Sequence, residues 1–141
     1  MNTANESVVI DASPFDISEF ELLDTGVLTV QNAKGDDDLI SKGQPVKIEL
    51  YGSGSAQAVK VAHKAGQRSA ARVAQLVRGK VNKREAENAE EEEIEKLVAL
   101  TKSISPNFPL TPEEIYSNPK LGYITRQVKE YLAADSNFSK G

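Results

Sequence analysis

Two short segments early in the chain have the apolar and polar pattern of half-buried β-strands. Residues 26–31 are rich in branched side chains, and residues 45–51 alternate strictly between apolar and polar positions. Turn-forming Gly, Asn, Asp and Ser fill much of the segment between them, so a β-hairpin with a long loop is predicted. Because two strands alone are marginally stable in water, the apolar face of Val46, Ile48 and Leu50 must pack against a helix or another chain.

A long helix is predicted to follow, from a serine N-cap at Ser55 to about Arg78. Its largely apolar stripe recurs at steps of three and four: Val59, Ala62, Gly66, Ser69, Val73 and Leu76. A neighbouring face carries a basic row at steps of four: Lys60, Lys64, Arg68 and Arg72. Small residues in the middle of the stripe allow close approach of another helix, but they bury little area at about 25 cal/mol per Å². This helix is therefore not expected to be stable by itself.

The acidic segment that comes next, residues 84–102, is predicted to form a second helix. Its glutamates lie mainly in the first turns, where they complement the helix dipole. If the two helices fold back on each other as a hairpin, several of these glutamates come near the basic row. The expected neighbours of Arg68 and Arg72 are Glu90, Glu91 and Glu93. Each exposed pair would contribute only about 0–1 kcal/mol, so charge pairing can select the orientation but cannot hold the hairpin together.

The C-terminal part is predicted to be helical after a linker with two prolines at residues 103–109. Thr111, Pro112 and Glu114 form a capping-box sequence with proline at the first helical position. A further helix is predicted between residue 118 and about residue 134. Its apolar positions recur at steps of three and four: Leu121, Ile124, Val128 and Tyr131 or Leu132. A polar tail is expected to follow.

Together these elements predict an α+β protein that is mainly α-helical, with an N-terminal β-hairpin, a helical hairpin and a C-terminal helical segment. Residues 1–25 are acidic and irregular and are interpreted as an arm. Residues 26–104 and 105–141 are expected to form a single compact unit, because 141 residues fit one domain. Apolar residues make up 39% and aromatic residues 6% of the chain, with no Trp, so its core should be thin and aliphatic.

Few residues are candidates for chemistry. The chain has no cysteine, which excludes disulfides, thiol nucleophiles and cysteinyl metal sites. His63 is the only histidine, and its basic neighbours favour an ordinary surface position. The three aspartates at 36–38 lack EF-hand spacing, and the glycines at 52 and 54 lack the rest of a phosphate-binding motif, so a solvated loop and a simple turn are expected. No catalytic residue, cofactor or metal is predicted, and an enzyme is the least expected class.

Charge is sorted into two adjoining blocks. Residues 53–84 contain eight Lys and Arg and no acid, whereas residues 85–95 contain seven Glu and no base. Such sorting gives neighbouring surfaces opposite fields, which suits binding. The net charge of -4 and the absence of any aromatic residue between 53 and 84 argue against nucleic acid as the main partner. No stretch approaches the roughly 20 apolar residues of a membrane span, so a cytosolic protein is expected.

The order of several segments resembles one protein family. The N-terminal part reads GVLTV, then GQPVKIELYG and a serine before the basic helix, and the C-terminal part reads FPLTPEE, NP, ITRQV and finally NF. Over residues 24–140 this pattern resembles the tail assembly chaperones of long-tailed bacteriophages. The resemblance implies a non-catalytic protein that binds the tape measure protein and helps tail tube protein assemble around it. It also implies a place in the host cell cytoplasm and not in the mature virion, and a longer frameshifted product is common in the family.

The basic helix and the last helix together supply the predicted surface for a client or for self-association. Its residues are Val59, Lys60, Ala62, Lys64, Gly66, Arg68, Arg72, Val73, Ile124, Val128 and Tyr131. From periodicity alone, the stripe on the last helix could equally be core or partner groove. Two other classes of function stay open: a structural virion protein of the tail or the head-tail joint, and a small nucleic-acid-binding regulator.

Overall fold

The computed structural model describes residues 14–77 and 85–140. The first elements are η1 (Ile17–Glu19), β1 (Thr25–Thr29), β2 (Ile40–Ser41), β3 (Gln44–Pro45), β4 (Lys47–Tyr51) and α2 (Ala56–Val77). They are followed by α3 (Glu85–Ala99), β5 (Thr101–Ile104), α4 (Pro112–Tyr116), η2 (Pro119–Leu121), α5 (Gly122–Ala133) and η3 (Asp135–Phe138). The predicted α+β class is confirmed, with an early strand-rich region followed by helices.

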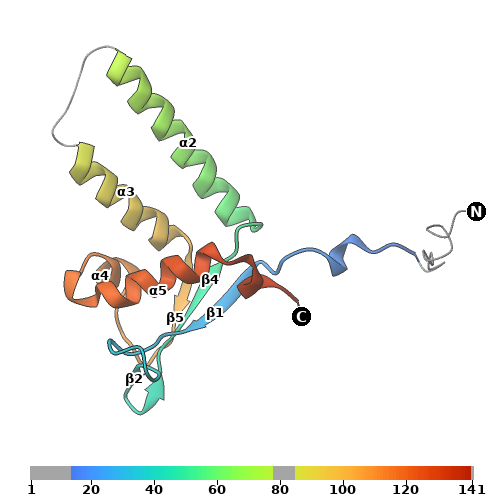
Figure 1. The fold of residues 1–141 in the computed structure, drawn as a ribbon, viewed down its shortest axis with the longest axis vertical. Coiled ribbons are helices and arrows are strands. Elements are labelled where there is room, and N and C mark those ends of the chain that lie inside the picture. The colour runs from blue at the N-terminus through green and yellow to red at the C-terminus, as the bar shows by residue number, and fades with distance from the viewer. Residues whose placement is uncertain (1–13, 78–84, 141) are drawn as a thin grey trace, which may run out of the picture.

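An antiparallel sheet with strand order β1-β4-β5 forms the base of the molecule (Figure 1). The predicted hairpin is β1 paired with β4, in a register that places Leu28 opposite Ile48. The edge strand β5 was not predicted, because its segment had been read as the end of the acidic helix and the start of a linker. It is only four residues long, and Lys102 and Ser103 at its centre are exposed. Pairing with β4 creates this strand, and a local pattern search cannot detect that.

The core lies between one face of the sheet and the helices. Ile48 and Leu50 of β4 are fully buried, whereas Lys47 between the buried positions Val46 and Ile48 is exposed, as the alternation predicts. The buried cluster comprises Val30, Val46, Ile48, Leu50, Leu97, Ile115, Tyr116, Ile124 and Val128. Tyr116 is the only aromatic member of this cluster, which is otherwise aliphatic, as predicted from the composition.

The C-terminal segment closes this arrangement. Phe138 in η3 is completely buried, and the sequence pattern gives no sign of this burial. A Cβ atom built on Gly52 would lie 2.8 Å from Phe138 Cδ1, so the ring needs a glycine beside it. The Tyr131 ring contacts Phe138 edge-on at a centroid distance of 5.4 Å. Glycine at the end of β4 therefore makes room for a ring more than eighty residues later in the chain.

The predicted capping box of α4 is present. Glu114 N donates to Thr111 Oγ1 at 3.2 Å, and Thr111 N donates to Glu114 Oε1 at 3.2 Å. Replacing Thr111 with alanine leaves a donor at the helix start without its partner, so we expect the free energy of unfolding to fall by about 1 kcal/mol. Urea denaturation measures this loss. Glu113→Ala is the control, and equal values for the two variants would contradict a role for the cap.

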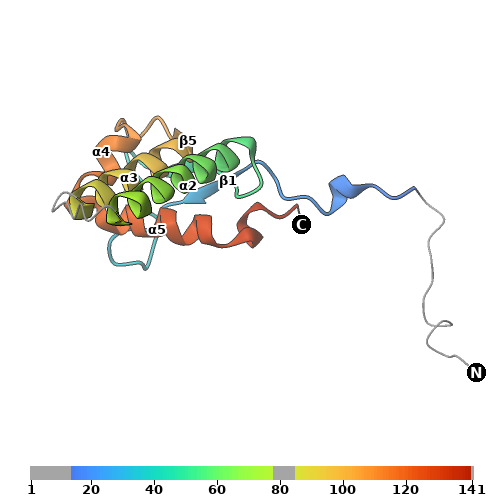
Figure 2. The same ribbon diagram turned by 90° about the horizontal axis from the view of Figure 1, so that it is seen from above.

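Two parts of the chain extend away from this body. Helices α2 and α3 form an antiparallel hairpin that rises beyond one end of the sheet, while residues 14–22 leave it in another direction (Figure 1). The view from above shows the same separation of the N-terminal segment from the helices (Figure 2). The hairpin confirms the predicted pair of long helices.

Candidate partner-binding groove

The beginning of α2 is fixed to the sheet by a serine cap, as predicted. Ser55 Oγ accepts from Ala58 N at 3.1 Å and donates to Gly52 O at 2.7 Å, and Ser55 itself is buried. Gln57 Nε2 donates to Ala99 O at 2.9 Å, which ties the first turn of α2 to the last turn of α3. Beyond this anchored end, nearly every described side chain of α2 is exposed. The helix is therefore held firmly at its base and loosely along its length.

A groove of about 600 Å³, here called the main groove, lies between α2, α3 and α5. Most of its lining is apolar: Tyr51, Ala58, Val61, Ala62, Ala65, Leu97, Leu100, Leu132 and Ala133. Lys96, Lys129 and Glu93 supply its charged groups, and Lys129 Nζ lies 4.0 Å from Glu93 Oε1. An apolar floor with charges of both signs at its edge is the pattern of a groove that accepts an amphipathic segment.

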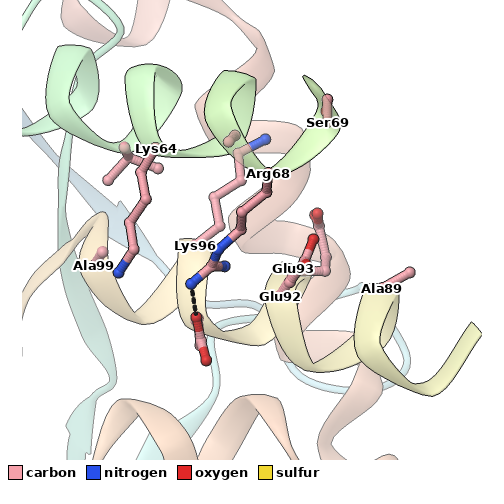
Figure 3. A pocket seen from close by; sticks show the side chains of 11 residues that line it. Lys64, Arg68, Ser69, Ala89, Glu92, Glu93, Lys96 and Ala99 are labelled. Carbon is pink, nitrogen blue, oxygen red and sulfur yellow. Dashed lines mark hydrogen bonds and ion pairs between the residues drawn. The ribbon is translucent and has the colours of Figure 1, made fainter. Parts of the chain in front are cut away.

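A second groove of about 340 Å³, the side groove, lies on the seam between α2 and α3 (Figure 3). Val61 and Ala65 line both grooves, so they mark this seam. Arg68 Nη2 contacts Glu95 Oε2 at 2.8 Å across it, with the side chains 33% and 60% exposed. Arg68 thus pairs with an acid of α3, as predicted, but with Glu95 in place of Glu90, Glu91 or Glu93. At this exposure the pair contributes about 0–1 kcal/mol.

The apolar stripe predicted on α2 lies on the surface. Val59 and Val73 are each 59% exposed, Ala62 and Gly66 are exposed, and a Cβ built on Gly66 would meet nothing within 4 Å. Helix α3 lies instead along Val61 and Ala65, which are on the face of α2 next to the predicted apolar stripe. Close to half of the α2 circumference is consequently apolar or small, and α3 covers only one edge of it.

The basic residues of the predicted surface lie beside this stripe. Lys60 and Lys64 are exposed, and Lys64 and Arg68 line the side groove. The side chain of Arg72 lies outside the described part of the structure. His63 is exposed, as expected, with its Nε2 3.2 Å from Gln67 Nε2. The basic row therefore accompanies the exposed stripe along α2, and it reaches the acidic residues of α3 at Arg68.

The C-terminal members of the predicted surface need correction. Ile124 and Val128 are completely buried and belong to the core between α5 and the sheet, so they are not available to a partner on the surface. Tyr131 is half-buried against that core and against Phe138. The part of α5 that lines the main groove is Lys129, Leu132 and Ala133. The sequence prediction named Leu132 only as an alternative to Tyr131 on the stripe, and it missed Lys129 and Ala133, which lie off the stripe.

Burial favours the neutral form of two tyrosines near the core. Burial raises the pKa of Tyr116, although its hydroxyl lies 2.6 Å from Thr101 Oγ1, a hydrogen bond that acts in the opposite direction. Burial also raises the pKa of Tyr131. Both phenols therefore stay neutral at physiological pH. Among the described residues, no cluster of three His, Asp or Glu could hold a metal ion, and no helix is long and apolar enough to cross a membrane.

Comparison of the chain with protein-family models, with curated proteins and with solved structures found no match in any of the three. Function has to be argued from the groove itself and from the pattern of the sequence.

Proposed function

We propose that the protein is a non-catalytic tail assembly chaperone that binds the tape measure protein of a long-tailed bacteriophage and promotes assembly of the tail tube protein around it. The observation that carries this proposal is the exposed apolar half of α2, which lies beside the main groove. The sequence pattern that resembles this chaperone family supplies the identity of the client. On this proposal the protein acts in the host cell cytoplasm and leaves before the virion is complete.

The groove has the chemistry that such a client needs. A segment of a long helical protein presents apolar residues at steps of three and four with charged residues beside them. The floor formed by Val61, Ala65 and Leu132 accepts the apolar face, and Lys96 and Glu93 at the edge offer one charge of each sign. Small residues on α2 permit close approach of the client backbone, and they impose little shape specificity. A holder that must receive many different segments benefits from both properties.

Co-expression with the tape measure protein of the same phage tests this function. We expect the wild-type chain to raise the soluble yield of the client several-fold, because covering its apolar surface prevents aggregation. The double variant Val59→Asp, Val73→Asp places two charges on the exposed stripe and should abolish most of this gain. Both valines are 59% exposed, so the variant is expected to fold.

The control carries the same two charges on the polar face of α2, as Gln67→Asp, Ala71→Asp, where both residues are exposed. It has the larger helix-propensity cost, because alanine and glutamine favour a helix more than valine does, and it should still keep the gain. An unchanged yield with the wild-type chain, or equal yields with the two double variants, would refute the proposal. Mass spectrometry of purified virions separates it from the alternative of a virion protein, because a chaperone should be absent from the particle.

A further inference from the structure

The N-terminal arm, defined here as residues 14–23, exposes a cluster of large apolar side chains. Phe15 is 79%, Phe20 is 73% and Ile17 is 64% exposed. The Phe15 and Phe20 rings stack on each other at a centroid distance of 5.6 Å. Single exposed apolar residues are ordinary, but a cluster of them on one short segment marks a contact surface. Most of the apolar area of the arm is therefore free to be covered by a partner.

The arm is attached to the body mainly at its root. Leu23 N donates to Phe138 O at 2.7 Å, and Gly52 N donates to Asp24 O at 2.8 Å. Further out, Lys140 Nζ donates to Ser18 O. From this root, residues 14–22 run away from the sheet and away from the α2–α3 hairpin (Figures 1 and 2). The arm thus runs away from the α2–α3 hairpin of its own chain (Figures 1 and 2), and its two phenylalanines are exposed.

The charge on the arm is opposite to that on the face of α2. No base precedes Lys34 in the sequence, and the arm carries Asp16, Glu19 and Glu21. Helix α2 has no acid at all, and two further lysines, Lys96 and Lys129, line the main groove. An acidic apolar segment and an apolar groove with two lysines and one glutamate therefore occur in the same chain. Such complementarity speeds encounter and selects the orientation of a complex.

We propose that the arm of one copy docks in the main groove of a second copy. Its phenylalanines lie against the apolar floor and its carboxylates lie beside Lys96 and Lys129. The groove volume of about 600 Å³ suits a short apolar segment. Reciprocal exchange of two arms gives a closed two-fold dimer, in which each site is completed by the other copy. This proposal goes beyond the proposed function and needs no client.

Sedimentation velocity of the full chain over a wide range of protein concentration provides the first test. The wild-type chain should form a dimer in a concentration-dependent manner. Phe15→Ser, Phe20→Ser removes the apolar contacts of the arm and should raise the dimer dissociation constant at least about 100-fold. Ala62→Glu places a bulky acid in the groove, at an exposed position, and should have a similar effect. All three proteins should give the same circular dichroism spectrum.

Disulfide trapping then identifies the two surfaces, since the chain has no cysteine of its own. A mixture of Ser18→Cys and Ala62→Cys chains should cross-link into heterodimers on oxidation. The mixture of Ser18→Cys with Ala71→Cys, on the polar face of α2, is the control and should cross-link far less. A monomeric wild-type chain, an arm variant that dimerises as tightly as the wild type, or an intramolecular disulfide in a monomeric Ser18→Cys, Ala62→Cys chain would each overturn the proposal.

Discussion

Phe138→Ala is expected to lower the free energy of unfolding by about 3–5 kcal/mol, a large part of the roughly 5–15 kcal/mol that a domain of this size possesses. The ring is completely buried and packs against the Gly52 backbone. Its removal leaves a cavity beside β4, and β4 cannot easily close it because it is held by pairing with β1 and β5. It also removes the edge-on contact with Tyr131, which contributes about 0.5–1.5 kcal/mol of this loss.

Urea denaturation followed by circular dichroism measures the effect. Phe20→Ala is the matched control, because this phenylalanine is 73% exposed on the arm and its truncation should change the free energy of unfolding by no more than about 0.5 kcal/mol. Similar losses for the two variants would mean that Phe138 does not belong to the core. A larger loss for Phe138→Ala than for Phe20→Ala would show that η3 is part of the fold.

Local signals in the sequence were sufficient for most of the elements. Alternation predicted β4, the serine before α2 and the capping box at Thr111 predicted helix starts, and the prolines at 112 and 119 lie at helix beginnings. The elements that were missed depend on tertiary contacts. Strand β5 forms because β4 offers a free edge, and η3 is ordered because glycine in the sheet leaves room for Phe138. Neither condition is visible in the four or five residues concerned.

The candidate site was predictable only in part, for a related reason. The spacing of Val59, Gly66 and Val73 correctly indicated an apolar face on α2, and the structure places it at the surface. The same spacing on α5 described the core residues Ile124 and Val128. Whether an apolar stripe is buried depends on how its helix packs on the sheet, and the whole core determines this packing. Lys129 and Ala133 of α5, which line the main groove, lie between the periodic positions, so periodicity gives no signal for them.

Amide hydrogen exchange should divide the molecule into two levels of stability. The amides of β4, paired on both sides, are expected to exchange only through global unfolding. The amides in the middle of α2 should exchange at least about 100-fold faster, because this helix buries few side chains along its length and an isolated helix is marginal in water. Mass spectrometry of deuterium uptake measures both segments in one experiment. Equal protection of α2 and β4 would show that α2 belongs to the same cooperative unit.

Gly66→Ala provides the matched variant for this experiment. A methyl group at this position meets nothing within 4 Å, so the substitution acts through helix propensity alone. It should stabilise α2 by about 0.8–1 kcal/mol and slow its exchange about fivefold, while the amides of β4 keep their rates.

A partner that occupies the main groove adds a larger effect, about 2.7 kcal/mol or 100-fold slower exchange at a concentration 100 times its dissociation constant. Saturating client that left α2 exchange unchanged would show that it binds elsewhere.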